Sequence, residues 1–284
     1  MLDAPLSGGR LQGKTAVITG GSSGLGLATA KQFVAQGARV LITGSNPEKL
    51  LKAKEEIGAS VTTQVADVCS SSDLAALATT AKKTLGTVDV LFANAGVGTF
   101  APVSDVSEKD FDWLFNTNVK GVFFTVQHLA PLMTAGGSII LNASATHGRG
   151  KAGGSIYFAT KAAVRSFART MADEYGPLGI RVNALSPGLV QTGFQARTGL
   201  PEEALGGFGQ YVVDTAPMSR LGTPDEIARA AIFLASDDSS YMTAAALVDE
   251  GGNKEVKASY RAGDCSKSSS GSGGRLIAAG LMAA

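Results

Sequence analysis

Two side chains four residues apart, Tyr157 and Lys161 in the run Y-F-A-T-K, form a candidate acid-base pair. Positions i and i+4 of a helix share one face, with their Cβ atoms about 5 to 6 Å apart. A free phenol has a pKa near ~10, and a neighbouring ammonium stabilises the phenolate and lowers that pKa. The spacing therefore predicts a pair tuned for acid-base chemistry. A lone Y-x-x-x-K is also typical of an amphipathic surface helix, so other signals must accompany it.

A glycine-rich turn, T-G-G-S-S-G-L-G at residues 19–26, follows a short apolar run. Gly20, Gly24 and Gly26 permit a tight turn and a close approach of the backbone to a pyrophosphate at a helix N-terminus. The spacing differs from the common G-x-G-x-x-G dinucleotide fingerprint. A plain strand-to-helix connection would also use glycines, so the turn alone is a weak signal.

Ser144 stands directly after the apolar run 138–143 and thirteen residues before Tyr157. A hydroxyl at the carboxyl end of a parallel strand faces the region where such sheets bind ligands. Taken alone, Ser144 is also typical of a polar residue that ends a strand.

The elements that must position these groups are seven short runs rich in Val, Ile and Leu, separated by helical patterns. Their length and composition are typical of strands buried on both faces. After the first run, Leu27, Ala30 and Val34 share one helical face, and Gly37 follows where a helix end favours a left-handed residue. Alternation over residues 14–252 predicts the α/β class, a Rossmann-type doubly wound parallel sheet in a single domain. The predicted strands are residues 15–19, 40–43, 61–66, 88–93, 138–143, 181–185 and 245–248.

Over residues 13–252 the chain resembles the short-chain dehydrogenase/reductase family. The resemblance rests on motifs in the family's order: the glycine-rich turn, N-A-G at residues 94–96, Asn118, Ser144, Y-x-x-x-K, P-G at residues 187–188, Thr192, and the runs 220–228 and 233–236. Two residues depart from the family pattern. Ala244 stands where members usually have Gly, and Glu250 where they usually have Asp. We expect both to loosen a C-terminal turn or subunit contact without touching the catalytic residues.

The resemblance implies four catalytic roles. Tyr157 would protonate a carbonyl oxygen during reduction or take the alcohol proton during oxidation. Ser144 would hydrogen-bond that oxygen, and Lys161 would lower the pKa of Tyr157 and hold the nicotinamide ribose. Asn118 would anchor a water that relays the proton to solvent. The hydride chemistry itself belongs to the nicotinamide cofactor.

The resemblance also implies the cofactor contacts. Asp67 would meet the adenine ring, residues 94–96 would form a cofactor-facing turn, and Thr192 would contact the carboxamide. No Cys/His cluster indicates a metal site. The expected cofactor-binding residues are Gly20, Ser22, Ser23, Gly24, Leu25, Gly26, Ser45, Asp67, Val68, Asn94, Ala95, Gly96, Tyr157, Lys161, Pro187, Gly188, Val190 and Thr192.

The residues that follow the second predicted strand determine the choice between NAD(H) and NADP(H). Gly44 stands where NAD-preferring relatives usually carry an acid that would repel a 2′-phosphate. Ser45 and Ser23 stand where NADP-preferring relatives usually carry an Arg, but Ser45, Asn46 and Thr43 offer neutral hydrogen bonds. This predicts a modest preference for NADP(H) with measurable use of NAD(H). A purely turn-forming role for these residues is compatible with either cofactor.

Composition limits the partners and the location. The 284 residues are 44% hydrophobic, enough for a sizeable core, and the formal net charge of +1 gives no global attraction to nucleic acid or an anionic membrane. No run approaches the ~18 apolar residues of a membrane helix. With only Cys69 and Cys265, the chain fits a reducing cytoplasm. The family implies a homo-oligomer, a tetramer, paired through helices near residues 110–129 and 157–175.

The end of the chain changes character. Residues 191–219 mix glycines with large apolar side chains, which is typical of a mobile apolar lid. Residues 254–284 form a Ser/Gly-rich tail, predicted to be flexible and outside the folded domain of residues 1–253. It could be an added extension or a segment that docks on a partner subunit.

The function predicted is an NAD(P)-dependent oxidoreductase acting on a small alcohol or carbonyl substrate. A 3-oxoacyl reductase and a sugar or secondary-alcohol dehydrogenase are both open as substrate variants. The alternative is a catalytically silent dinucleotide-binding sensor or scaffold, against which Ser144, Tyr157 and Lys161 together count. His147 is expected to be incidental, and Phe111 and Trp113 are expected in the core or at a subunit interface.

Overall fold

The computed structural model describes residues 9–194, 198 and 202–252. The domain boundary at residue 253 and the predicted tail 254–284 lie outside the described residues. Within the described part, seven strands form one sheet in the order β3-β2-β1-β4-β5-β6-β7, and every neighbouring pair is parallel. All seven predicted strands are confirmed. Their bounds are β1 Thr15–Ile18, β2 Arg39–Gly44, β3 Val61–Val65, β4 Val88–Ala93, β5 Met133–Asn142, β6 Arg181–Pro187 and β7 Ala246–Asp249.

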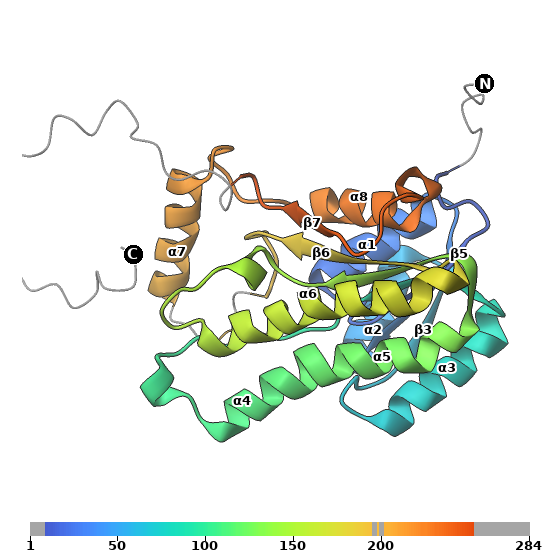
Figure 1. Cartoon of the computed structure of the whole chain (residues 1–284), viewed down its shortest axis with the longest axis horizontal. Coiled ribbons are helices and arrows are strands. Elements are labelled where there is room, and N and C mark those ends of the chain that lie inside the picture. The colour runs from blue at the N-terminus through green and yellow to red at the C-terminus, as the bar shows by residue number, and fades with distance from the viewer. Residues whose placement is uncertain (1–8, 195–197, 199–201, 253–284) are drawn as a thin grey trace, which may run out of the picture.

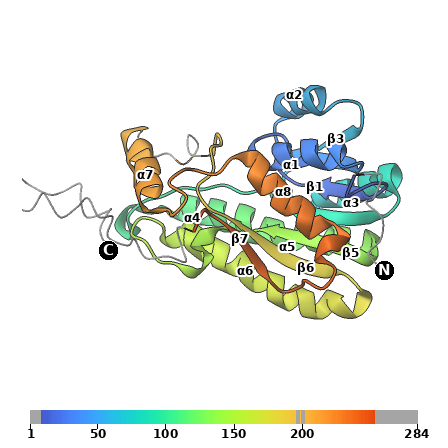
Figure 2. The ribbon, with the colours of Figure 1, turned by 90° about the horizontal axis from the view of Figure 1, so that it is seen from above.

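Helices cover both faces of the sheet, so the predicted doubly wound Rossmann-type fold is confirmed (Figures 1 and 2). One face carries α1 (Gly24–Ala35), α2 (Pro47–Ile57) and α8 (Pro224–Ala235). The other carries α3 (Ser71–Leu85), α4 (Glu108–Phe115), α5 (Gly121–Leu129) and α6 (Ser155–Tyr175). The strand order reverses between β1 and β4, which is where open α/β sheets place their ligands.

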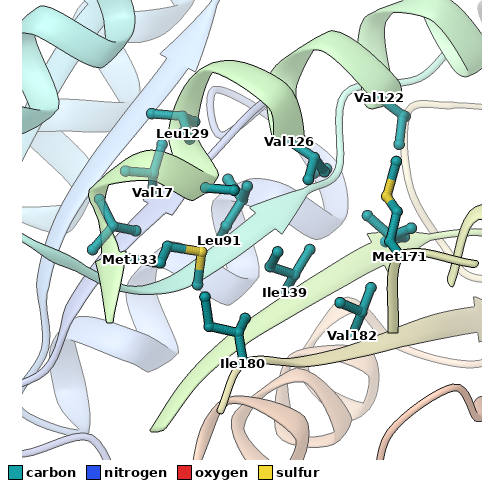
Figure 3. Close-up of a cluster of buried hydrophobic side chains, with 14 of the residues drawn as sticks. Val17, Leu91, Val122, Val126, Leu129, Met133, Ile139, Met171, Ile180 and Val182 are labelled. Carbon is teal, nitrogen blue, oxygen red and sulfur yellow. The ribbon is translucent and has the colours of Figure 1, made fainter. Parts of the chain in front are cut away.

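The strands build two hydrophobic cores because successive side chains point to opposite faces. Val17 and Leu91 pack on the side of α3, α5 and α6, a cluster drawn in Figure 3. Ile18 and Phe92, each one residue further along its strand, pack on the side of α1 and α8. All four side chains are fully buried. Burial on both faces explains why these strands read as continuous apolar runs.

Some elements differ from expectation. Strand β5 begins at Met133, five residues before its predicted start, and the helix expected near residues 110–129 is α4 joined to α5 through the π-helical turn Asn116–Lys120. The predicted lid segment contains an ordered helix, α7 (Glu202–Thr215), despite its glycines. Val212 and Ala216 are buried at its end, which gives the helix an anchor that its local sequence does not provide.

Helix α7 (orange) stands apart from the helices that cover the sheet (Figure 1). It therefore adds nothing to either sheet face and is placed to shape a ligand site instead.

Candidate active site

A cavity of about 1030 Å³ opens where the strands end. Residues that follow all seven strands line it, together with residues of α7. Two expected site residues, Gly26 and Asn118, are absent from its lining. The expected residues that do line it are Gly20, Ser22, Ser23, Gly24, Leu25, Ser45, Asp67, Val68, Asn94, Ala95, Gly96, Ser144, Tyr157, Lys161, Pro187, Gly188, Val190 and Thr192.

The glycine-rich turn shapes one end of the cavity. Gly20 has φ 65°, and a Cβ there would lie 2.9 Å from the Cα atom of Ala95. A Cβ at Gly26 would lie 2.3 Å from the carbonyl oxygen of Gly20, so this glycine allows α1 to pack onto the turn. The side chain of Ser23 caps none of the first amides of α1. A helix N-terminus reached by bare backbone fits an anionic pyrophosphate.

Three side chains join the ends of β1, β4 and β5 behind this turn. The hydroxyl of Thr19 accepts hydrogen bonds from the backbone amides of Asn94 (3.0 Å) and Ala95 (3.1 Å). The Asn94 amide group donates to the Thr19 carbonyl at 2.9 Å, and Asn142 donates to Asn94 Oδ1 at 2.9 Å. The N-A-G motif thus fixes the relative positions of three strand ends, and neither Thr19 nor Asn142 was among the expected residues.

Helix α6 brings the predicted pair into the cavity. The Nζ atom of Lys161 lies 5.7 Å from the ring centroid of Tyr157 and donates a 2.9 Å hydrogen bond to the carbonyl oxygen of Asn142. Lys161 is only 4% exposed. Ser144, at the end of β5, hydrogen-bonds the Tyr157 side chain. The structure therefore gathers Ser144, Tyr157 and Lys161 in one place.

Burial dominates the titration of this pair. It raises the pKa of Tyr157 to about 12, although the hydrogen bond with Ser144 acts in the opposite direction. Burial also lowers the pKa of Lys161 to about 8. Lys161 is not among the causes of the Tyr157 shift, so the expectation that Lys161 lowers the pKa of Tyr157 stays a prediction. Burial destabilises the phenolate more than the hydrogen bond from Ser144 stabilises it. The Lys161 ammonium donates its hydrogen bond to the Asn142 carbonyl and not to the phenol.

Asn118 lies behind the cavity wall and is fully buried. Its Oδ1 atom accepts from the Val97 amide at 2.8 Å, and its Nδ2 atom donates to the Val97 carbonyl at 2.9 Å and to Thr160 Oγ1 at 3.1 Å. The side chain therefore braces the loop after β4. Its expected role in proton relay stays a prediction.

The cavity wall formed by the end of β2 is polar and uncharged. Ser22, Thr43 and Ser45 line the cavity, and a Cβ on Gly44 would come within 2.8 Å of the Ser22 hydroxyl. Within the described residues, nothing hydrogen-bonds the buried Oγ1 atom of Thr43. Asn46 does not line the cavity, because its side chain caps α2 by accepting from the Lys49 amide at 2.9 Å. The expectation that Asn46 serves the cofactor is therefore not supported.

The opposite end of the cavity is aromatic, and the sequence did not reveal it. Ring centroids of Phe100, Phe194 and Phe158 lie 5.3, 6.0 and 6.3 Å from that of Tyr157. These rings come from separate segments with no periodic pattern, so no sequence signal groups them. They offer an apolar surface beside the phenol.

Charged side chains border this aromatic end. The Glu250 carboxylate is 4% exposed and lies 4.0 Å from the Arg149 guanidinium. The Nζ atom of Lys151 lies 4.3 Å from the ring centroid of Tyr211 and 5.3 Å from that of Phe208, both on α7. Arg149, Lys151 and Glu250 all line the cavity. The departure at Glu250 therefore reaches the cavity wall, beyond the turn or subunit contact expected for it.

The other departure from the family pattern, Ala244, has φ 58°, a left-handed conformation that favours glycine.

The sequence also led to expectations for three further side chains. His147 places Nδ1 2.7 Å from the Ser144 carbonyl oxygen and 3.2 Å from the Ser186 hydroxyl, so it stabilises the segment after β5. Phe111 and Trp113 are 45% and 42% exposed, which excludes the core location. In residues 9–252, apart from the gaps, no cluster of His, Cys, Asp or Glu could hold a metal ion.

The fold and the cavity together define a class, the oxidoreductases built on a dinucleotide-binding sheet. Similarity to known proteins specifies the family. A family profile described as enoyl-(acyl carrier protein) reductase matches residues 20–254. The chain belongs to the short-chain dehydrogenase/reductase family, whose members bind NAD(P)(H), as its sequence motifs predicted.

Relatives that this chain matches over nearly their whole length support the family assignment. Oxidoreductase asL5 of Sarocladium schorii is 41% identical over 249 residues, which cover 87% of this chain and 98% of that protein. The 3-oxoacyl-[acyl-carrier-protein] reductase FabG of Thermotoga maritima is 35% identical, with 86% and 98% covered. The crystal structure of levodione reductase matches with a TM-score of 0.81 at 32% identity, covering 86% of this chain and 98% of that one. No helix among the described residues is long and apolar enough to cross a membrane.

Proposed function

We propose that the chain is an NAD(P)-dependent carbonyl reductase or alcohol dehydrogenase in which Tyr157 exchanges a proton with the substrate oxygen. The observation that carries this proposal is the meeting of Ser144, Tyr157 and Lys161 in the cavity that also contains the glycine-rich turn. The relatives named 3-oxoacyl-[acyl-carrier-protein] reductase and gluconate 5-dehydrogenase are consistent with chemistry of this kind.

The bound nicotinamide would supply or accept the hydride. Tyr157, protonated at neutral pH, would donate its phenolic proton to the substrate oxygen during reduction. Ser144 would donate a hydrogen bond to the same oxygen as negative charge develops there. Lys161, fixed by the Asn142 carbonyl, would hold the ribose hydroxyls, and the aromatic rings would keep water from the reacting carbon.

A panel of ketones and alcohols, followed by the absorbance of the reduced nicotinamide with both cofactors, tests this proposal. We expect turnover of at least one carbonyl compound by the wild-type protein. Cofactor binding without turnover of any panel member would instead support the silent sensor or scaffold. Lys161→Ala should weaken both turnover and cofactor binding, and an unchanged cofactor Kd would contradict the ribose role.

We further propose that NADP(H) is modestly preferred and NAD(H) is also used. Ser22, Thr43 and Ser45 line the cavity, and Gly44 stands beside them without a carboxylate that would repel a 2′-phosphate. Comparison of kcat/KM for both cofactors on one substrate tests this, and a clear preference for NAD(H) would overturn it. Ser45→Arg should strengthen NADP(H) binding, because a guanidinium matches phosphate geometry.

We also propose a cytoplasmic homotetramer. Phe111 and Phe123 expose apolar rings on α4 and α5, which is typical of a surface covered by another subunit. Light scattering on the chain ended at Asn253 should give a tetramer. A monomer would contradict the proposal, and assembly seen only with the tail restored would assign residues 254–284 a role in it.

A further inference from the structure

Lys151 belongs to the loop that connects Ser144 to the catalytic helix. Its backbone carbonyl accepts a 3.1 Å hydrogen bond from the amide of Gly154, directly before α6 begins. Its side chain lines the cavity at the aromatic end. The loop that carries Lys151 is therefore fixed to the same helix that carries Tyr157.

The ammonium of Lys151 is held by rings. Its Nζ atom lies over Tyr211 and Phe208 of α7, at 4.3 and 5.3 Å from their centroids. Such rings attract a cation but accept none of its proton donors in the way that a carboxylate does. An ammonium in this setting keeps N–H groups for a bound acceptor.

No acidic side chain neutralises this ammonium within the described part of the chain. Of the two cations that border the aromatic end, Arg149 faces the Glu250 carboxylate. Glu203 also lines the cavity, but it is exposed and forms no ion pair with Lys151. Partial burial and the Arg149 guanidinium both lower the pKa of Lys151, which shows that its environment lacks a compensating negative charge.

We propose that the substrate carries an acidic group on an apolar body, and that Lys151 binds this group while the rings beside Tyr157 contact the body. The inference rests on the proposed oxidoreductase function and adds the substrate class. A partly desolvated ammonium gains more from an incoming anion than a fully hydrated one does, because the interaction is less screened. Lys151 would then select keto acids or hydroxy acids over their neutral analogues.

Matched probes test this inference: benzoylpropionate, a stable aromatic keto acid, and its methyl ester. We expect wild-type kcat/KM for the acid to exceed that for the ester by roughly tenfold or more, mostly through KM. Lys151→Met should bring the acid-to-ester ratio close to one, and Lys151→Arg should keep the preference. Lys83→Met, an exposed lysine on α3, serves as the control that removes the same charge elsewhere.

Two results would overturn the inference. One is an acid no better than the ester with the wild type. The other is an unchanged acid-to-ester ratio in Lys151→Met, and equal losses on both probes would mean that Lys151 only holds α7. If neither probe is turned over, the proposed function fails on these substrates. Calorimetric binding of both probes to the cofactor-loaded protein then tests the role of Lys151 separately. Acid that binds the wild type no more tightly than the ester, or no more tightly than it binds Lys151→Met, would overturn the inference.

Discussion

The two ends of the cavity are built differently. At the glycine-rich end, strand ends are joined by short hydrogen bonds among Thr19, Asn94 and Asn142, and the backbone itself forms the surface. At the aromatic end, separate loops and α7 contribute rings and charges, including Phe194 and Lys151. A rigid sheet edge suits a fixed cofactor, whereas loops allow the substrate site to vary.

The largest effect is expected at the junction of the two ends. Tyr157→Phe keeps the ring and its contacts with Phe100 and Phe194 but removes the proton donor. Turnover should fall by roughly 10² or more, while the cofactor Kd stays nearly unchanged. Tyr175→Phe, at the far end of the same helix, is the control. Near-normal turnover in Tyr157→Phe would refute the assigned role.

The pH dependence of alcohol oxidation shows whether burial or the Lys161 charge dominates the pKa of Tyr157. Because its pKa is raised to about 12, the phenol is protonated at neutral pH and the phenolate that alcohol oxidation requires is scarce. Oxidation should therefore rise about tenfold per pH unit from neutral pH and still be rising at about pH 10, with folding followed by circular dichroism at each pH. Because Lys161 loses its charge near pH 8, kcat is measured at saturating cofactor, where a weaker ribose contact does not limit the rate. A plateau of kcat well below pH 10 under these conditions would show that Tyr157 ionises more readily in the working enzyme.

Rigidity of the glycine-rich end is tested by two buried threonines. Thr19→Val removes the acceptor for two backbone amides and should lower the free energy of unfolding by about 2 kcal/mol. Thr43→Val removes a buried hydroxyl that no described residue hydrogen-bonds, so its effect on stability should be close to zero. Chemical denaturation of both variants measures the difference. Equal decreases in the free energy of unfolding would mean that the hydrogen bonds of Thr19 add no stability beyond that of a buried hydroxyl.

The aromatic end should respond through substrate binding. Phe194→Ala removes a ring near Tyr157, and KM for an aromatic ketone should rise roughly tenfold, about 1.4 kcal/mol. The cofactor Kd and the melting temperature should change little, because Phe194 lies in a loop and not in a sheet core. A large rise in the cofactor Kd would show that the two ends are coupled.

The smallest effect, a change in stability, is expected at Ala244, which lies outside both ends of the cavity. Ala244 has φ 58°, and its amide donates a 2.8 Å hydrogen bond to the Val182 carbonyl, so the conformation is held in place. Ala244→Gly relieves the steric cost of a left-handed alanine but increases the freedom of the unfolded chain. We expect a net gain of at most about 1 kcal/mol, and thermal melting that shows a loss would contradict this reasoning.

Local sequence determined much of this protein. The apolar runs predicted all seven strands. Central strands such as β1 and β4 are buried on both faces and need only a short apolar stretch, whereas the edge strands β3 and β7 are only partly buried. Helical periodicity placed Tyr157 and Lys161 on one face of α6, and glycines marked the turn that precedes α1. These features depend on residues close together in the chain, so they can be read from it.

Tertiary structure decided the rest. The raised pKa of Tyr157 depends on how deeply the packed helices bury it, which no local pattern encodes. Lys151 meets Tyr211 some sixty residues later, and Arg149 meets Glu250 about a hundred residues later, because the sheet brings those segments to one edge. Contacts and burial of this kind arise only when distant segments pack together, so the chemistry of the substrate end is a property of the fold.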